Sequence, residues 1–109
     1  MAQTPEAKVK TKIKAYLKTI PQCWWFCPIG GAYSTHGIPD IIGHVNGQFF
    51  AIEVKAPGRH GNTTALQRLE ISKIIINGGT ALVASDVQHV IDAFVRMGWD
   101  RKSVDITAS

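Results

Sequence analysis

Hydrophobic residues recur along the first part of the chain with the spacing of a helix. We expect this helix to run from about Pro5 to Thr19, with Thr4 as N-cap, because proline is favoured at the first helical position. Its buried stripe, at a period of about 3.6 residues, is Val9, Ile13, Tyr16, Leu17 and Ile20. At about 100° per residue, Glu6 falls inside the arc of this stripe, so its carboxylate is predicted to point toward the interior.

An inward-facing Glu6 has two explanations. A carboxylate in the first turn is favoured by the helix dipole whatever its role. Burial of a carboxylate is costly, however, unless a cation or hydrogen bonds receive it. The second explanation is therefore that a nearby metal ion or lysine binds the Glu6 carboxylate.

The middle of the chain has the pattern of strands. One strand is predicted over Cys23 to Pro28, and two more over Ile38 to Val45 and Gln48 to Lys55. Asn46-Gly47 between the last two is the strongest short-range hairpin signal, so we expect an antiparallel pair. The preceding segment, residues 29–37, is predicted to be a glycine-punctuated loop, a kind of segment that often carries function.

The second half of the chain predicts two further helices around one strand. A basic loop over residues 56–62 leads to a helix that begins at Thr63 or Thr64 and ends near Asn77, before Gly78-Gly79. Thr80 to Ala84 is predicted to be a buried strand, and a last helix begins at Ser85 or Asp86. The apolar residues of that helix are Val87, Val90, Ile91, Phe94 and Val95. The predicted order is αβββαβα, an α/β domain over residues 1–98 followed by a tail over 99–109.

Length and composition narrow the class of protein. A chain of 109 residues, 45% hydrophobic, suits one folded domain. No apolar run approaches the roughly 20 residues of a membrane span, and the N-terminus lacks a signal-peptide core, so we expect no membrane association and a cytoplasmic location. The two cysteines, Cys23 and Cys27, are expected to be reduced core thiols, because a zinc site would need two more ligands at suitable spacing.

The net charge of +4 is concentrated at the N-terminus, where residues 1–20 hold five lysines and one acid. Such a surface would attract a polyanion such as DNA, although lysine-rich helix faces are more often solvated surface. Lys8 and Lys12 are the candidates for this contact.

The hairpin brings three charged residues together. If Asn46 and Gly47 form the turn, Val45 faces Gln48, and counting outward places Asp40 opposite Glu53. Side chains so placed start about 5 Å apart, and like charges there destabilise a sheet unless a cation lies between them. Lys55 lies two residues beyond Glu53 and points to the same face, whereas Phe50, Ile52 and Val54 form the opposite, hydrophobic face. A simple surface salt bridge of Lys55 with either acid is the alternative.

Two carboxylates completed by waters and a substrate phosphate suit Mg²⁺, and Mn²⁺ as well. Such an ion can polarise a phosphodiester and lower the pKa of a bound water. Lys55 would orient that water or stabilise developing charge. The pattern therefore predicts metal-dependent hydrolysis of a phosphodiester.

The residues Gly37-Ile-Pro-Asp40 followed by Glu53-Val-Lys55 resemble the PD-(D/E)XK nuclease superfamily, and within it the VRR-NUC domain in its short stand-alone phage and bacterial form. The resemblance covers the chain up to about residue 98 and includes Glu6, the hairpin, Ala56-Pro-Gly58, Gln67 and Gly78-Gly79, in the expected order. It implies a restriction-endonuclease-like core with a mixed sheet flanked by helices.

The resemblance also implies roles for individual residues. Asp40, Glu53 and the main-chain carbonyl of Val54 would bind the metal, with Glu6 close by, and Lys55 would position the attacking water. Gln67 would support the site from the following helix, and an exposed, helix-compatible polar residue is the alternative interpretation. The residues that could touch the DNA backbone, or only face solvent, are Tyr33, Ser34, His36, Arg59 and His60.

The implied activity is that of a DNA endonuclease selective for branched structures such as Holliday junctions, a repair-type function. The small members of the family look like homodimers, and one site cuts one strand, so paired incisions would need a twofold dimer. A non-catalytic DNA-binding subunit with the same fold is the second hypothesis. A sequence-specific restriction enzyme is a third hypothesis, disfavoured because no segment of the chain has the pattern of an element dedicated to recognising bases.

Overall fold

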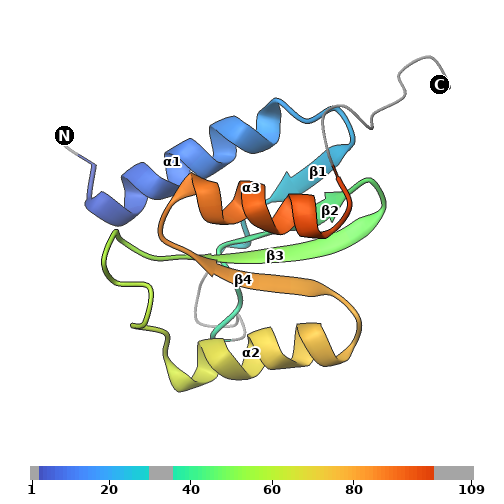
Figure 1. Ribbon diagram of the computed structural model, residues 1–109. Coiled ribbons are helices and arrows are strands. Elements are labelled where there is room, and N and C mark those ends of the chain that lie inside the picture. The colour runs from blue at the N-terminus through green and yellow to red at the C-terminus, as the bar shows by residue number, and fades with distance from the viewer. Residues whose placement is uncertain (1–2, 30–35, 100–109) are drawn as a thin grey trace, which may run out of the picture.

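The computed structural model describes residues 3–29 and 36–99, and they form an α/β unit with three helices and one four-stranded mixed sheet. Figure 1 shows α1 and α3 on one side of the sheet and α2 on the other. The elements are α1 (Pro5–Lys18), β1 (Cys23–Phe26), β2 (Ile41–Val45), β3 (Gln48–Val54), α2 (Ala65–Ile76), β4 (Thr80–Ala84) and α3 (Val87–Arg96). The predicted order αβββαβα is confirmed.

The sheet has the strand order β1-β2-β3-β4, antiparallel except for the parallel pair β3–β4. Val45 pairs with Gln48 and Ile41 with Ile52, the register predicted from the turn. Asn46 and Gly47 both have positive φ (49° and 80°), as a two-residue turn of a twisted hairpin requires. The strands β1, β2 and β3 are shorter than their predicted spans.

The hydrophobic core lies between the sheet and the pair α1–α3. Thr4 and Asp86 cap these two helices with their side chains, as the N-cap rule predicts. The fully enclosed side chains include Ile13, Leu17, Ile41, Val45, Phe50, Ile52, Val54, Val90 and Phe94. Val95 is exposed, so the predicted stripe of α3 is too wide, and Trp99 is buried, so the core extends one residue past the predicted boundary at 98. Tail residues 100–109 lie outside the described ranges.

The other face of the sheet is only partly covered. The helix α2 packs over β3 and β4, and no residue of α2 is buried. The strand β1 lies at the edge of the sheet, and Trp24 and Phe26 are exposed on its outer face, so the prediction of a buried strand was wrong for that face. Cys23 and Cys27 are free thiols, half-buried and packed against the core from the other face, as predicted. Burial on the other face raises the pKa of the Cys23 thiol to about 11. The strand β4 is likewise less enclosed than predicted, with Ala84 alone fully buried.

No helix in the described ranges has both the length and the apolar character needed to cross a bilayer.

Candidate active site

The predicted acidic pair forms at the open end of the hairpin. Asp40 immediately precedes β2 and continues its register, which places it opposite Glu53 of β3. The two carboxyl groups are hydrogen-bonded to each other. One oxygen of Asp40, Oδ2, also accepts the main-chain N–H of Val54 at 2.8 Å, which fixes the orientation of that carboxylate. The two acids therefore meet on one face of the sheet, as the alternation of side chains predicts.

Glu53 is the one charged side chain in the described ranges that is classed as buried, with 4% of its surface exposed. The pKa of Glu53 is raised from 4.5 to about 8, first by desolvation and then by the hydrogen bond to Asp40 and the charge of Asp40. Lys55 lowers this pKa and Glu6 raises it by smaller amounts. A buried acid beside a second acid binds a proton tightly, and a divalent cation can take the place of that proton.

Lys55 is held on the same face by Gln67 of α2. The ammonium Nζ of Lys55 donates to Oε1 of Gln67 at 3.0 Å, and the same oxygen accepts the main-chain N–H of Thr64 at 2.9 Å. Thr64 in turn accepts from the N–H of Gln67, which completes a capping box at the start of α2. A lysine ammonium has three donors, so this bond leaves two for other acceptors, and the charge of Lys55 lowers the pKa of Glu53. No described residue forms a salt bridge with Lys55, so the surface salt-bridge alternative is not what the structure contains.

The capping role of Gln67 was missed at the level of sequence, although the signal is present. Thr64-Ala-Leu-Gln67 has the threonine and the glutamine at the spacing of a capping box. The start of α2 and the position of Lys55 therefore depend on one side-chain oxygen.

Gly37 brings the segment that carries Asp40 close to α2. It has a φ of +87°, and a Cβ built there would lie 2.5 Å from the main-chain oxygen of Leu66. Only glycine fits such an approach with a left-handed backbone. The segment Gly37–Asp40 can therefore enter the space between the sheet and the first turn of α2.

Glu6 differs from the prediction in its burial. Its side chain is exposed in the first turn of α1, instead of pointing into the core. Glu6 lies three residues before Val9, the first buried residue of α1, so the helical period gives the direction of its side chain at a point where the core has already ended. The negative charge of Glu6 still raises the pKa of Glu53, so Glu6 is close enough to interact electrostatically with the acidic pair.

The candidate DNA contacts are dispersed. Lys8 and Lys12 are exposed and line a hollow of about 260 Å³ that lies between α1 and the start of α3. Arg59 and His36 are exposed. The ring of His60 packs against that of His89 at 5.1 Å, and its Nδ1 lies 3.5 Å from Oγ of Ser85. Tyr33 and Ser34 lie outside the described residues.

The donor set of the pair suits a hard divalent cation. No group of three histidine, cysteine or acidic side chains with the arrangement of a metal site occurs in residues 3–29 and 36–99. The protein ligands of such an ion there would be the two carboxylates and main-chain oxygens. Val54 directs its N–H toward Asp40, and the carbonyl of a strand residue points the same way as its N–H. Mg²⁺ commonly uses one or two carboxylates and keeps several waters, so this set fits it.

Comparison of the chain with protein-family models finds no match, and comparison with curated proteins finds none either.

Proposed function

We propose that this protein is a Mg²⁺- or Mn²⁺-dependent DNA endonuclease of the PD-(D/E)XK type, with Asp40, Glu53 and Lys55 as its catalytic residues. The observation that carries the proposal is the contact of two carboxyls, one of them buried, with a lysine on the same face. The order αβββαβα and the charged end of the hairpin agree with a restriction-endonuclease-like core of the VRR-NUC kind. Those likenesses support the proposal by pattern alone.

Each residue would contribute a distinct step. A divalent ion held by Asp40, Glu53 and the carbonyl of Val54 would supply Lewis-acid activation of the phosphodiester and of the attacking water. Asp40 is oriented for this by the N–H of Val54. Lys55, fixed by Gln67, would donate to the attacking water or to a phosphate oxygen as negative charge builds up.

The preferred substrate that we propose follows from the resemblance to VRR-NUC domains. Branched DNA, such as a four-way junction, is the expected substrate, and the cationic side chains of Lys8 and Lys12 would bind its backbone. A single site cuts one strand, so symmetric incision of a junction would need a twofold homodimer.

The test is cleavage of supercoiled plasmid, of a four-way junction and of a linear duplex with Mg²⁺, Mn²⁺ or EDTA. We expect cutting that depends on the metal, and a loss of at least about 100-fold in Glu53→Gln and Asp40→Asn. Glu70→Gln makes the same chemical change at an acid of α2 that pairs with Lys73, and it should cut normally.

Two results would contradict the proposal. Cutting by Glu53→Gln at the rate of the unaltered protein would remove the assigned site. Tight binding of DNA without metal-dependent cutting by the unaltered protein would favour the non-catalytic DNA-binding subunit instead.

A further inference from the structure

Exposed aromatic rings lie on the same face of the sheet as the acidic pair. Trp24, His44 and Phe49 are register neighbours on β1, β2 and β3, so they form a row across the sheet. Phe26 lies two residues along β1 on the same face. Trp24, Phe26 and Phe49 are 56%, 45% and 42% exposed, and His44 is exposed as well. We call these four residues the aromatic strip.

The rings on the neighbouring strands β1 and β2 contact one another. The indole of Trp24 stacks on the imidazole of His44 with centroids 6.0 Å apart and planes 22° apart. It also meets the ring of Phe26 at 5.5 Å, tilted by 45°. Contiguous exposed apolar side chains on a protein surface commonly mark an interaction site. The strip therefore offers flat ring faces to a partner.

The aromatic strip leads along the strands to the candidate active site. His44 and Asp40 are four residues apart on the same face, as are Phe49 and Glu53. At the rise of a strand, four residues span about 13 Å. A ligand that covers the strip can therefore reach the acidic pair without crossing to another face.

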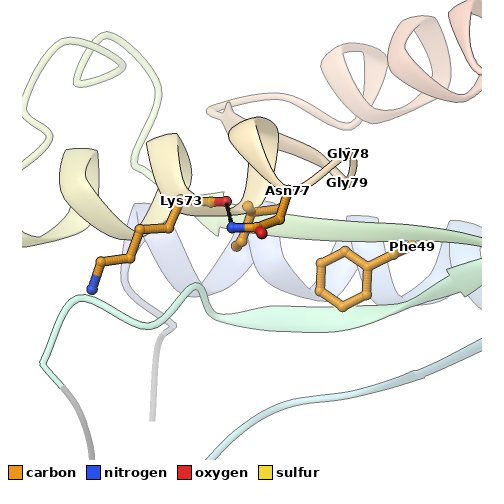
Figure 2. A pocket seen from close by; sticks show the side chains of 6 residues that line it. Phe49, Lys73, Asn77, Gly78 and Gly79 are labelled. Carbon is orange, nitrogen blue, oxygen red and sulfur yellow. Dashed lines mark hydrogen bonds between the residues drawn. The ribbon is translucent and has the colours of Figure 1, made fainter.

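A pocket of about 430 Å³ lies where the aromatic strip meets α2, and Phe49, Lys73, Ile74, Asn77, Gly78 and Gly79 line it. Figure 2 shows the phenyl ring of Phe49 beside the last turn of α2. Lys73 lies on that turn, and its ammonium is paired with Glu70 at 3.1 Å. The pocket thus combines an aromatic wall with a nearby cation and the amide of Asn77.

We propose that the aromatic strip stacks the unpaired bases of a single-stranded segment of the DNA substrate. The proposal rests on the nuclease assignment above and names the part of a branched substrate that this face holds. Every base has a π face, so stacking on rings is tolerant of sequence and suits single strands. Continuity with the acidic pair favours a nucleic acid over a second copy of the chain as the occupant.

The test is binding in EDTA, so that cleavage does not interfere. A short labelled oligothymidylate and a blunt duplex of equal length are titrated with the full chain, and anisotropy and tryptophan emission are recorded. Of the three tryptophans, Trp99 is buried and Trp25 is half-buried, so quenching by a stacked base reports mainly on Trp24. We expect Trp24→Ala to weaken oligothymidylate binding by about 5- to 100-fold and to abolish the quenching. Duplex binding should change less than about twofold, because a blunt duplex offers no unpaired base to a side chain that stacks bases.

Two further variants control this experiment. Trp24→Phe keeps an aromatic face and should retain most of the affinity. Ile75→Ala removes an exposed apolar side chain of α2 that lines a different hollow, and it should bind as the unaltered protein does. Circular dichroism confirms that each variant is folded. Unchanged binding and quenching by oligothymidylate in folded Trp24→Ala would overturn the proposal.

The outcomes separate the two proposals. Metal-dependent cutting with binding that is indifferent to Trp24 leaves the nuclease and refutes the aromatic strip. Stacking on Trp24 without metal-dependent cutting supports the strip and refutes the nuclease. Sedimentation velocity tests the other occupant: a dimer that Trp24→Ala converts to monomer would identify this face as a contact between copies and overturn the proposal.

Discussion

The proton held by the acidic pair gives the metal-free protein a stability that depends on pH. Glu53 has a pKa of about 8 in the folded protein and 4.5 as its ordinary value. Below pH 4.5 both states are protonated and the group has no effect. As the pH rises toward 8, the unfolded chain releases this proton while the folded chain keeps it, so the free energy of unfolding falls, and the loss is complete above about pH 8.

The size of the effect follows from the same two values. At roughly 1.4 kcal/mol for each tenfold change in proton affinity, the loss is about 5 kcal/mol at full ionisation. A typical domain of this size is stable by about 5 to 15 kcal/mol. The loss is therefore large enough to move a denaturation midpoint visibly.

The assay is urea denaturation in EDTA, followed by tryptophan fluorescence, from about pH 5 to about pH 9. Glu53→Gln replaces the acid by a neutral side chain of the same shape and should flatten the decline, so the difference between the two curves isolates this group. Equal pH dependence in both proteins would refute the account of Glu53 as a buried acid that holds its proton.

Three further predictions concern the surroundings of the site. Gln67→Ala removes the acceptor that holds Lys55 and half of a capping box, so it should cost about 1 kcal/mol in urea denaturation and slow DNA cleavage by about 10-fold; unchanged cleavage would contradict the positioning role. Gly37→Ala should lower stability by at least about 1 to 3 kcal/mol in the same assay, because its φ is positive and α2 blocks a Cβ; a variant as stable as the unaltered protein would be inconsistent with that packing. Lys8→Ala and Lys12→Ala should each reduce the salt dependence of DNA binding by about one unit of slope, and an unchanged slope would remove that lysine from the contact surface.

The elements and the register were predictable because their signals are local. The turn at Asn46-Gly47 demands positive φ at two positions, which fixes the pairing of β2 with β3 and hence the meeting of Asp40 and Glu53. The N-cap residues of α1, α2 and α3 are Thr4, Thr64 and Asp86, and all three were among the predicted ones. The spacing of the apolar residues, every two residues in a strand and about every 3.6 in a helix, then predicts which side of each element is apolar.

The extent of burial was less predictable, because it depends on what covers each face. Cys23-Trp-Trp-Phe26 is hydrophobic throughout, yet only a helix on each side would bury both of its faces, and α2 packs over β3 and β4 instead. For Glu6, helical periodicity gives the direction of the side chain and not the point at which the core ends. Lys55 and Gln67 likewise meet only after the loop between them closes, a contact that spacing alone does not specify.

The two faces of β3 explain why an acid can be buried at this position. Phe50, Ile52 and Val54 pack against α1 and α3 and supply the stabilising hydrophobic contacts. On the other face, Glu53 is enclosed beside a second acid, an arrangement that lowers stability whenever both are charged and no cation is bound. A sheet that only had to fold would be more stable with an apolar residue there. The hydrophobic contacts on one face thus offset the cost of two acids on the other, which a bound cation would neutralise, and this is the physical argument for the catalytic role proposed for Asp40 and Glu53.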